Sequence, residues 1–232
     1  MAKPLVFLGT YLNLRRFYDI AQSCGYEVAG IVDHAHYNNQ LTNTFQGIPV
    51  IGTPNTFFND PDNKDRYCFF LSRMFPEPNV EEKPMSWSRL DYINLINTLD
   101  LECISLIAPT AQLADTVELG RGSYVGGNCV IGNYVELKDF CQIHENSLIS
   151  DHSVVGVNTN IQRRVTFVGH TKIGNNCQIG LETMFGKNNV TIGDDAIVQS
   201  GFIIARDIAP GEVVHLSGRI LKKIYPKHRI ID

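Results

Sequence analysis

The second half of the chain carries a repeat of six residues, and this repeat limits the folds that the sequence can adopt. An aliphatic or aromatic side chain returns at every sixth position, without a gap, at Ile107, Leu113, Leu119, Val125, Ile131, Leu137, Ile143, Ile149, Val155, Ile161, Phe167, Ile173, Ile179 and Phe185. One residue is then inserted, and the series resumes at Ile192, Val198 and Ile204. A fixed period of this kind predicts an architecture of stacked, similar units.

The length of the period indicates the structure of each repeating unit. Six residues fit neither the 3.6 residues of a helical turn nor the alternation of a long strand. They fit a short strand and a tight corner, and three such hexads make one coil of 18 residues. The aliphatic side chain fills the coil, and the usually small residue four places later, such as Cys129 or Ser147, turns inward. Glycine often follows the aliphatic residue, and we expect its backbone freedom to relieve the bend. Such coils stack into a parallel β-helix with one continuous core.

The N-terminal part of the chain alternates short apolar strands with helices. We expect strands over residues 4–9, 28–33, 47–52 and 67–72, and helices over residues 14–24 and 86–99. The Pro-rich, acidic residues 75–84 indicate a loop. This alternation indicates a small parallel α/β unit. The sequence therefore predicts a Rossmann-like α/β domain over residues 1–104 and a β-helix domain with a C-terminal tail over residues 105–232.

Composition and charge exclude several classes of protein. The 232 residues include 20 Lys and Arg against 24 Asp and Glu, and a net charge of −4 disfavours general nucleic-acid binding. No apolar run approaches the roughly 18 residues of a membrane span. The N-terminus lacks the features of a secretory signal, so we expect a cytoplasmic protein. The six cysteines form no C-x-x-C pair, and we expect reduced, buried thiols.

Several motifs, together with the order of the two parts, resemble one known family. VFLGTY follows the first strand, GIVD ends the second, GIPVIG comes next, PTAQLAD enters the repeats, and NSLISDHSVVG lies in the middle coils. With these motifs the chain resembles the hexapeptide-repeat sugar acetyltransferases, which include the bacillosamine-pathway N-acetyltransferases and the sialic-acid O-acetyltransferase-like proteins. The resemblance implies a left-handed β-helix, a homotrimer and acetyl-CoA as co-substrate. It also implies acetylation of the amine of a nucleotide-linked deoxyamino sugar, for surface polysaccharide or glycan biosynthesis.

In the family the nucleotide binds to the N-terminal domain, so the residues that follow its strands are the candidate nucleotide-binding residues. The first strand is followed by Gly9, Thr10 and Tyr11. One glycine is too few for the dinucleotide fingerprint G-x-G-x-x-G. Backbone N–H groups at a helix start can still hold one phosphate. Asp33 ends the second strand, where a carboxylate can reach a ribose or base. For Gly9 and Asp33, a simple role in a turn is the alternative.

The catalytic pair of the family is swapped in this sequence. When the middle coils are aligned on VVG, the family's catalytic histidine falls on Asp151 and its acidic neighbour on His152. A histidine with its ordinary pKa of about 6.5 can take a proton from an amine, so His152 is the first candidate base and Asp151 the second. His144, or transfer without a protein base, is the remaining alternative. Tyr134, His152 and His170 are 18 residues apart, so we expect them to stack with a spacing of roughly 4.8 Å.

Acetyl-CoA requires positive charge for its phosphates and room for its pantetheine arm. The candidate cofactor-binding residues are Asn160, Gly201, Ala205, Gly218, Lys222 and Lys223. The resemblance places the adenine end near the last coils, close to the two lysines, and Asn160 and Gly218 match polar and glycine positions of the family. Gly201 and Ala205 are small, so they would let the arm lie close to the wall.

Other functions remain open at this point. No metal is expected, because His144, His152 and His170 are spaced by 8 and 18 residues and do not reproduce the three-histidine site of zinc-dependent β-helix carbonic anhydrases. A sugar O-acetyltransferase is one alternative function. A non-catalytic, trimeric sugar-nucleotide-binding protein is the other, and the swapped pair favours it.

Overall fold

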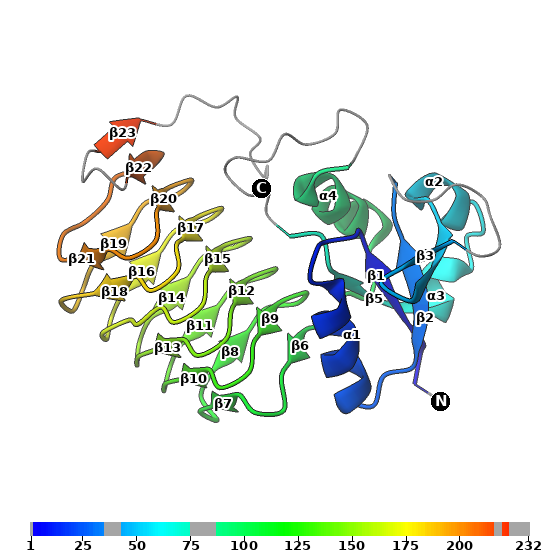
Figure 1. Ribbon diagram of the computed structural model, residues 1–232, viewed down its shortest axis with the longest axis horizontal. Coiled ribbons are helices and arrows are strands. Elements are labelled where there is room, and N and C mark those ends of the chain that lie inside the picture. Colours follow the sequence, from blue (N-terminus) through cyan, green and yellow to red (C-terminus); the bar gives the residue numbers. More distant parts are fainter. Residues whose placement is uncertain (1, 35–42, 75–86, 216–219, 223–232) are drawn as a thin grey trace. The chain divides into compact units, whose positions relative to one another are not determined.

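The chain folds into two compact units that meet in sequence between Leu106 and Ile107 (Figure 1), two residues beyond the expected boundary. The structure is a computed structural model that describes residues 2–34, 43–74, 87–215 and the backbone of 220–222. None of the helices in this described part is long and apolar enough to cross a membrane.

The first unit is a five-stranded sheet with helices. Its strands, in the spatial order β3-β4-β2-β1-β5, are β3 (Thr44–Phe45), β4 (Ile48–Gly52), β2 (Val28–Val32), β1 (Leu5–Leu8) and β5 (Cys68–Leu71). Its helices are α1 (Leu14–Ser23), α2 (Pro54–Phe57), α3 (Asn63–Arg66) and α4 (Arg89–Leu99). The four predicted strands and both long helices are confirmed. The sequence missed β3, α2 and α3, because two to four residues are too few to show a period.

Burial explains the order of the sheet. All four side chains of β1 and all four of β5 are buried, as expected for central strands of a parallel sheet. Strand β1 pairs in parallel with β2 on one side and with β5 on the other. The carboxyl ends of these three strands therefore meet at one edge, where the direction of winding changes and where ligands of such sheets bind.

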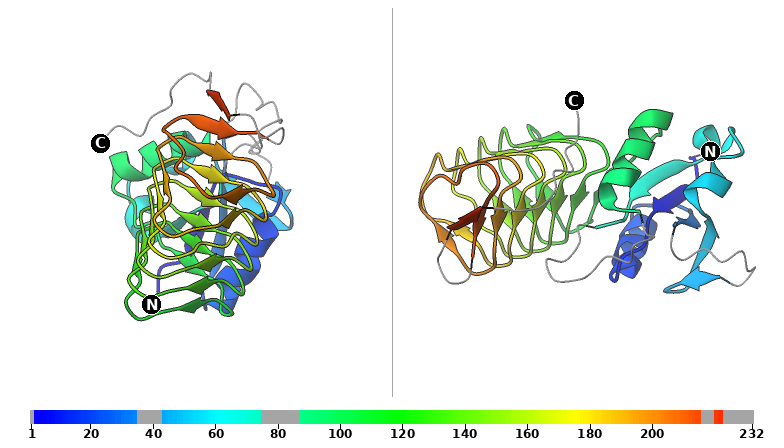
Figure 2. Two further views of the ribbon diagram at one scale, coloured as in Figure 1. Left: turned by 90° about the vertical axis from the view of Figure 1, so that its left-hand side faces the viewer. Right: turned by 90° about the horizontal axis from the view of Figure 1, so that it is seen from above.

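The second unit is a parallel β-helix, seen from two directions in Figure 2. Its strands are β6 (Leu106–Ile107), β7 (Gln112–Leu113), β8 (Glu118–Leu119), β9 (Tyr124–Val125), β10 (Val130–Ile131), β11 (Glu136–Leu137), β12 (Gln142–Ile143), β13 (Leu148–Ile149), β14 (Val154–Val155), β15 (Asn160–Ile161), β16 (Lys172–Ile173), β17 (Gln178–Ile179), β18 (Met184–Phe185), β19 (Thr191–Ile192), β20 (Ile197–Val198), β21 (Ile203–Ile204), β22 (Glu212–Val214) and β23 (Ile220–Lys222). Val130 pairs with Leu148, which confirms a coil of 18 residues. The inserted residue lengthens one coil, so that Lys172 pairs with Thr191.

The inward positions of the coils form the core, as the period predicts. The inward residues of the six-residue series, from Val125 to Ile204, are at most 4% exposed. The small corner residues are buried too, and several donate a hydrogen bond to a carbonyl of the next coil. The Sγ of Cys129 and of Cys177 and the Oγ of Ser147 lie 3.1, 3.1 and 3.0 Å from the carbonyl oxygens of His144, Gly193 and Gln162. This position therefore takes small side chains, and a thiol or hydroxyl there can donate to the next coil, whereas Val135 and Val165 fill it without a donor.

The glycines after the aliphatic residues have a different role from the expected one. The left-handed backbone lies two residues later, where non-glycine residues such as Asn128, Asn146 and Asn176 have φ of 56–60°. A Cβ at Gly132 would lie 2.2 Å from Oδ1 of Asp151 in the next coil. These glycines are thus required by the close approach of the next coil, and the expectation that they relieve the bend was wrong.

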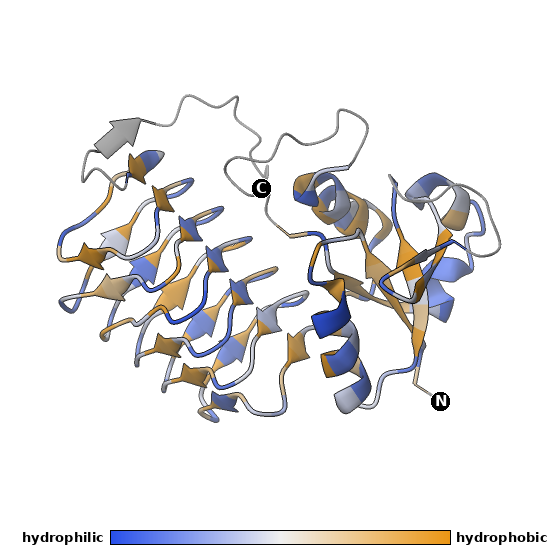
Figure 3. Cartoon of the chain, viewed as in Figure 1, coloured by the Kyte–Doolittle hydropathy of each residue, from blue (hydrophilic) through white to orange (hydrophobic). Residues whose placement is uncertain are grey.

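Each coil presents three outer faces of different character, because the first residue of every short strand points outward. The apolar face, on β10, β13, β18 and β21, carries Val130, Leu148, Met184 and Ile203, which are 39–69% exposed. Figure 3 shows β10, β13 and β21 as hydrophobic. The charged face carries Glu118, Glu136, Val154, Lys172 and Thr191. The amide face carries Tyr124, Gln142, Asn160 and Gln178.

Candidate functional site

Tyr134, His152 and His170 form a column of stacked rings at the corner between the apolar face and the charged face. The ring centroids of Tyr134 and His152 are 5.0 Å apart, and those of His152 and His170 are 4.9 Å apart. All three residues have a left-handed backbone, with φ of 56–59°, so their side chains leave each coil in the same direction. The predicted stacking is confirmed. His152 is exposed, and its ring edge faces solvent.

Asp151, beside His152, is engaged by the backbone. Its Oδ1 accepts a hydrogen bond of 2.7 Å from the N–H of Asn133 in the preceding coil. Asp139 and Asn175 occupy the equivalent place of the six-residue repeat at another corner and accept bonds of 3.1 and 2.8 Å from the corresponding N–H groups. This side chain therefore ties adjacent corners together. The sequence did not predict that role, and the candidate role of Asp151 as a base stays a prediction.

His144 lies at another corner, between the amide face and the apolar face, within a cluster of polar side chains. It is 3% exposed, its Nδ1 is 4.0 Å from Oε2 of Glu145, and its ring meets the ring of Tyr124 edge-on at 5.6 Å. The carboxylate of Glu145 is fixed by the hydroxyl of Tyr124 and by Nε of Arg163, each at 2.8 Å. A fixed carboxylate beside an imidazole can orient the ring and stabilise its charged form.

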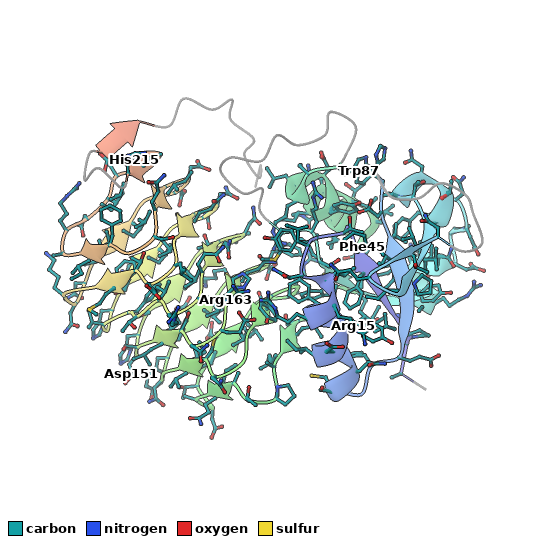
Figure 4. All side chains as sticks on the ribbon, in the orientation of Figure 1. Arg15, Phe45, Trp87, Asp151, Arg163 and His215 are labelled. Carbon is teal, nitrogen blue, oxygen red and sulfur yellow. The ribbon has the colours of Figure 1, made fainter. Side chains whose placement is uncertain are left out.

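The structure separates the three candidate catalytic residues into two groups. Asp151 and His152 follow strand β13, whereas His144 precedes it, so the apolar face lies between the two corners. Figure 4 labels Asp151 and Arg163, which mark these two corners. Within a single chain, the two groups therefore serve different parts of the surface.

The amide face holds two side chains with unpartnered atoms. Gln142 and Asn160 pair in register on adjacent strands and are 1% and 3% exposed. Within the described part of the chain, both amide atoms of Gln142 and the Oδ1 of Asn160 have no hydrogen-bond partner. By contrast, the stacked amides of Asn158 and Asn176 bond each other at 3.0 Å. Leaving a buried polar group unpaired costs about 1–3 kcal/mol, so this pair is suited to a polar ligand group.

The remaining candidate cofactor residues lie in the last coils or beyond them. Gly201 has φ of 80° at a corner, and nothing lies within 4 Å of the place where its Cβ would be. Ala205 is exposed, so both residues leave the outer wall open as expected. The backbone of Lys222 belongs to β23, which pairs antiparallel with β22, a hairpin that the sequence did not predict. Gly218 and Lys223 lie outside the described residues.

In the first unit, the turn after β1 is held by internal hydrogen bonds. The Oδ2 of Asp33 accepts bonds from the N–H of Thr10 at 2.6 Å and from its hydroxyl at 2.8 Å, and both residues are at most 2% exposed. Gly9 has φ of 82°, and a Cβ there would lie 2.6 Å from Cβ of Arg73. The structure thus brings these predicted residues together and gives Gly9, Thr10 and Asp33 a structural role in the turn. Tyr11 is half-buried beside them.

The start of α1 is capped by a residue from the β3–β4 turn. The Oε1 of Gln46 accepts a hydrogen bond of 2.8 Å from the N–H of Arg15, and its Nε2 donates to the carbonyl of Leu12. The N-cap residue Asn13 makes no side-chain hydrogen bond to the helix. A phosphate at this helix start would therefore replace the amide of Gln46.

No metal centre is formed in the part of the chain that the structure describes, since no group of three His, Cys, Asp or Glu side chains could hold an ion there.

Comparisons with known proteins show which proteins have a similar fold. No protein-family model matches the chain. Its structure is similar to the acetyltransferase domain of PglB from Neisseria gonorrhoeae, solved with acetyl coenzyme A, with a TM-score of 0.75 and 19% identity over 92% of this chain and 96% of that one. It is also similar to a GDP-perosamine N-acetyltransferase from Caulobacter crescentus, solved with CoA and GDP-perosamine, with a TM-score of 0.76 and 19% identity over 92% and 93% of the two chains. The chain has the fold of these acetyltransferases. The predicted resemblance to sugar acetyltransferases is confirmed at the level of the fold.

A comparison of sequences finds a further relative. Over 156 residues the chain is 26% identical to the bifunctional protein GlmU of Anaplasma marginale. The match covers 62% of this chain and 33% of that protein. The chain thus spans about a third of the length of this curated relative.

Sequence reasoning named Asn160 but missed Gln142, Glu145 and Arg163, which the fold brings into view. Glu145 and Arg163 are 18 residues apart with opposite charges, so the coil length could have paired them. Gln142 is likewise one coil from Asn160. No period links Tyr124 to Glu145, and only the structure reveals that bond.

Proposed function

We propose that the protein is an acetyl-CoA-dependent N-acetyltransferase acting on the amine of a nucleotide-linked deoxyamino sugar. One observation carries the proposal. Over 92% of its length the chain shares its fold with two relatives, one solved with CoA and GDP-perosamine and the other with acetyl coenzyme A. In line with these relatives, we take the coils to be left-handed and the first unit to be Rossmann-like. With acetyl-CoA as co-substrate, the reaction belongs in the cytoplasm, in surface polysaccharide or glycan biosynthesis.

The first unit would bind the nucleotide at the carboxyl ends of its parallel strands. The bonds between Thr10 and Asp33 shape the turn, so these two residues and Gly9 would act by holding the backbone in place. Tyr11, which is half-buried in the same turn, would contact the nucleotide directly.

The apolar face supports a homotrimer. Val130, Leu148, Met184 and Ile203 are exposed apolar side chains on one face, and Thr166 lies between Leu148 and Met184. A largely apolar face of this kind marks an interaction surface, and a second copy of the chain would cover it. In a ring of three, the apolar face of one copy meets a different face of the next, so every copy is covered alike. The two corners beside the apolar face, with His152 and His144, would then border the contact between copies.

The chemistry needs a base, a hydrogen-bond donor and a proton for the leaving thiolate. His152 would accept a proton from the sugar ammonium through its exposed ring edge. The neutral amine then attacks the thioester carbonyl, and the tetrahedral intermediate breaks its C–S bond to release CoA. The proton that the nitrogen must still lose passes to the thiolate of CoA. A side-chain amide such as that of Asn160 from a neighbouring copy would donate to the oxyanion. Asp151 remains the second candidate base, and His144 beside Glu145 is the third.

The deciding experiment is an assay of thiol release from acetyl-CoA with UDP-, dTDP- and GDP-linked amino sugars. Release that depends on one amino sugar, with an N-acetyl product in the mass spectrum, supports the proposal. The matching nucleotide sugars with hydroxyl in place of the amine test the O-acetyltransferase alternative. Binding of a nucleotide sugar without thiol release from any of them would favour the non-catalytic alternative and overturn the proposal.

A further inference from the structure

The carboxyl edge of the first sheet carries an aromatic group that the nucleotide-binding residues named above do not include. Trp87 precedes α4, and its ring stacks on the ring of His34, with centroids 5.7 Å apart and planes 20° from parallel. His34 follows Asp33 at the end of β2. Figure 4 shows Trp87 at the start of α4. The pair therefore lies at the edge where parallel sheets bind ligands.

The position of the Trp87 ring is fixed by the first residues of α4. Ser88 caps α4 in a reciprocal capping box with Asp91, which defines where the helix begins. Trp87 and Tyr92 then stand on either side of the cap, with ring centroids 5.3 Å apart, as in a hydrophobic staple. Tyr92 is 1% exposed, and its hydroxyl accepts a hydrogen bond of 3.1 Å from the N–H of His34. Burial raises the pKa of Tyr92, so this hydroxyl keeps its proton.

Unlike the buried ring of Tyr92, the indole of Trp87 and the imidazole of His34 are half-buried. A flat, half-buried ring pair at a ligand-binding edge is suited to stacking with another flat ring, and every nucleobase offers such a face. Positive charge lies at the same edge. Arg73 follows β5, and its guanidinium donates to the carbonyl of Thr10 at 3.2 Å. A nucleoside diphosphate carries both matching features, a flat base and a negative diphosphate.

We propose that Trp87, supported by His34, is the surface on which the base of the nucleotide-linked sugar stacks. This inference rests on the proposed function and adds a base-recognition residue to it. Stacking is tolerant of base identity, so Trp87 supplies affinity, whereas contacts to the base edge would select the base.

The chain contains a single tryptophan, which makes the proposal directly measurable. The emission of Trp87 in the full chain is followed during titration with UDP, dTDP, GDP and inorganic pyrophosphate. We expect a saturable change with at least one nucleotide and none with pyrophosphate. No change with any nucleotide, or an equal change with pyrophosphate, overturns the proposal.

Substitution separates stacking from folding. Trp87→Leu keeps an apolar side chain for the staple with Tyr92 and removes the flat ring. We expect it to weaken nucleotide binding by about 10- to 100-fold in calorimetry, with Trp87→Phe in between. The KM for the nucleotide sugar should rise with it, while the KM for acetyl-CoA stays the same. Tyr18→Leu removes a half-buried ring in the middle of α1 and serves as the control.

The outcomes distinguish this inference from the proposed function. Wild-type nucleotide affinity in Trp87→Leu overturns the stacking role, even if thiol release proceeds normally. Quenching of Trp87 by a nucleotide and weaker binding by Trp87→Leu support the stacking role, even if no amino sugar releases thiol from acetyl-CoA.

Discussion

The imidazole rings of His152 and His170 lie 4.9 Å apart with their planes within 2° of parallel. The ring of Tyr134 covers the other face of His152 at 5.0 Å. Both faces of the His152 ring are thus occupied, and a substrate can approach only in the plane of the ring. This is the plane in which the ring nitrogens accept and donate protons. The column therefore leaves the ring edge of His152, which carries both nitrogens, as its open side.

Replacing His152 by asparagine tests this role. Asparagine occupies the same left-handed corner in Asn146 and Asn158, so we expect His152→Asn to fold normally. Loss of a general base should lower kcat by about 10²–10⁴ with little change in KM. The measurement is the steady-state rate of thiol release as both substrates are varied.

Asp151→Asn and His170→Asn are the matched variants. Asn175 already fills the corner position of Asp151 elsewhere in the chain and accepts the same backbone bond, so Asp151→Asn should keep the fold. We expect both variants to retain kcat within about tenfold. A larger loss in Asp151→Asn than in His152→Asn would make Asp151 the base. If neither changes kcat by more than about tenfold, transfer depends on positioning or on His144, and the assignment to His152 is wrong.

Gly132→Ala tests the close approach of neighbouring coils. The new Cβ would lie 2.2 Å from Oδ1 and 2.9 Å from the backbone nitrogen of Asp151, so the next coil must move. We expect the free energy of unfolding to fall by about 2 kcal/mol or more, measured by urea denaturation. Gly169→Ala is the control, because its Cβ would make an ordinary contact of 3.4 Å. Equal stability of the two variants would contradict this account of the glycines.

The period of six specified the second unit because every inward residue has the same environment in each coil. That is why the column of His152 and His170 could be placed from the sequence. The purpose of the glycines could not, because it depends on the distance between coils. In the first unit, no period links Gln46 to the start of α1, or His34 to Trp87. Contacts of this kind depend on where the strands and helices pack, so the sequence alone could not reveal them.

Leu148→Lys tests the apolar face as the contact between copies. Leu148 is 39% exposed and pairs with Val130 in the adjacent coil, so a lysine there would place a charge within the proposed contact. We expect the wild-type chain to sediment as a trimer at micromolar concentration and Leu148→Lys to shift towards monomer, with loss of activity. Lys64→Glu, which changes an exposed lysine of α3 in the first unit, is the control and should remain trimeric. A fully active monomer of the wild type would contradict the trimer.

The last prediction concerns stability at high pH. Burial raises the pKa of the thiol of Cys177 to about 12 and that of Cys129 to about 11. In the unfolded chain a thiol loses its proton near pH 8.5, at about its ordinary pKa. Above that pH the unfolded chain binds fewer protons than the folded chain, so the free energy of unfolding falls as the pH rises towards 11.

The change is measured as the urea midpoint between pH 8 and pH 10.5 in the presence of a reductant. Cys177→Ser should lessen the fall by about 2 kcal/mol at pH 10, because serine does not titrate in this range. Its hydroxyl can donate to the carbonyl of Gly193, as Ser147 donates to Gln162 in an equivalent corner. Cys24→Ser removes an exposed thiol and is the control, so its midpoint should follow the wild type more closely. The same pH slope in Cys177→Ser and the wild type would show that the thiol of Cys177 is not held protonated by the fold.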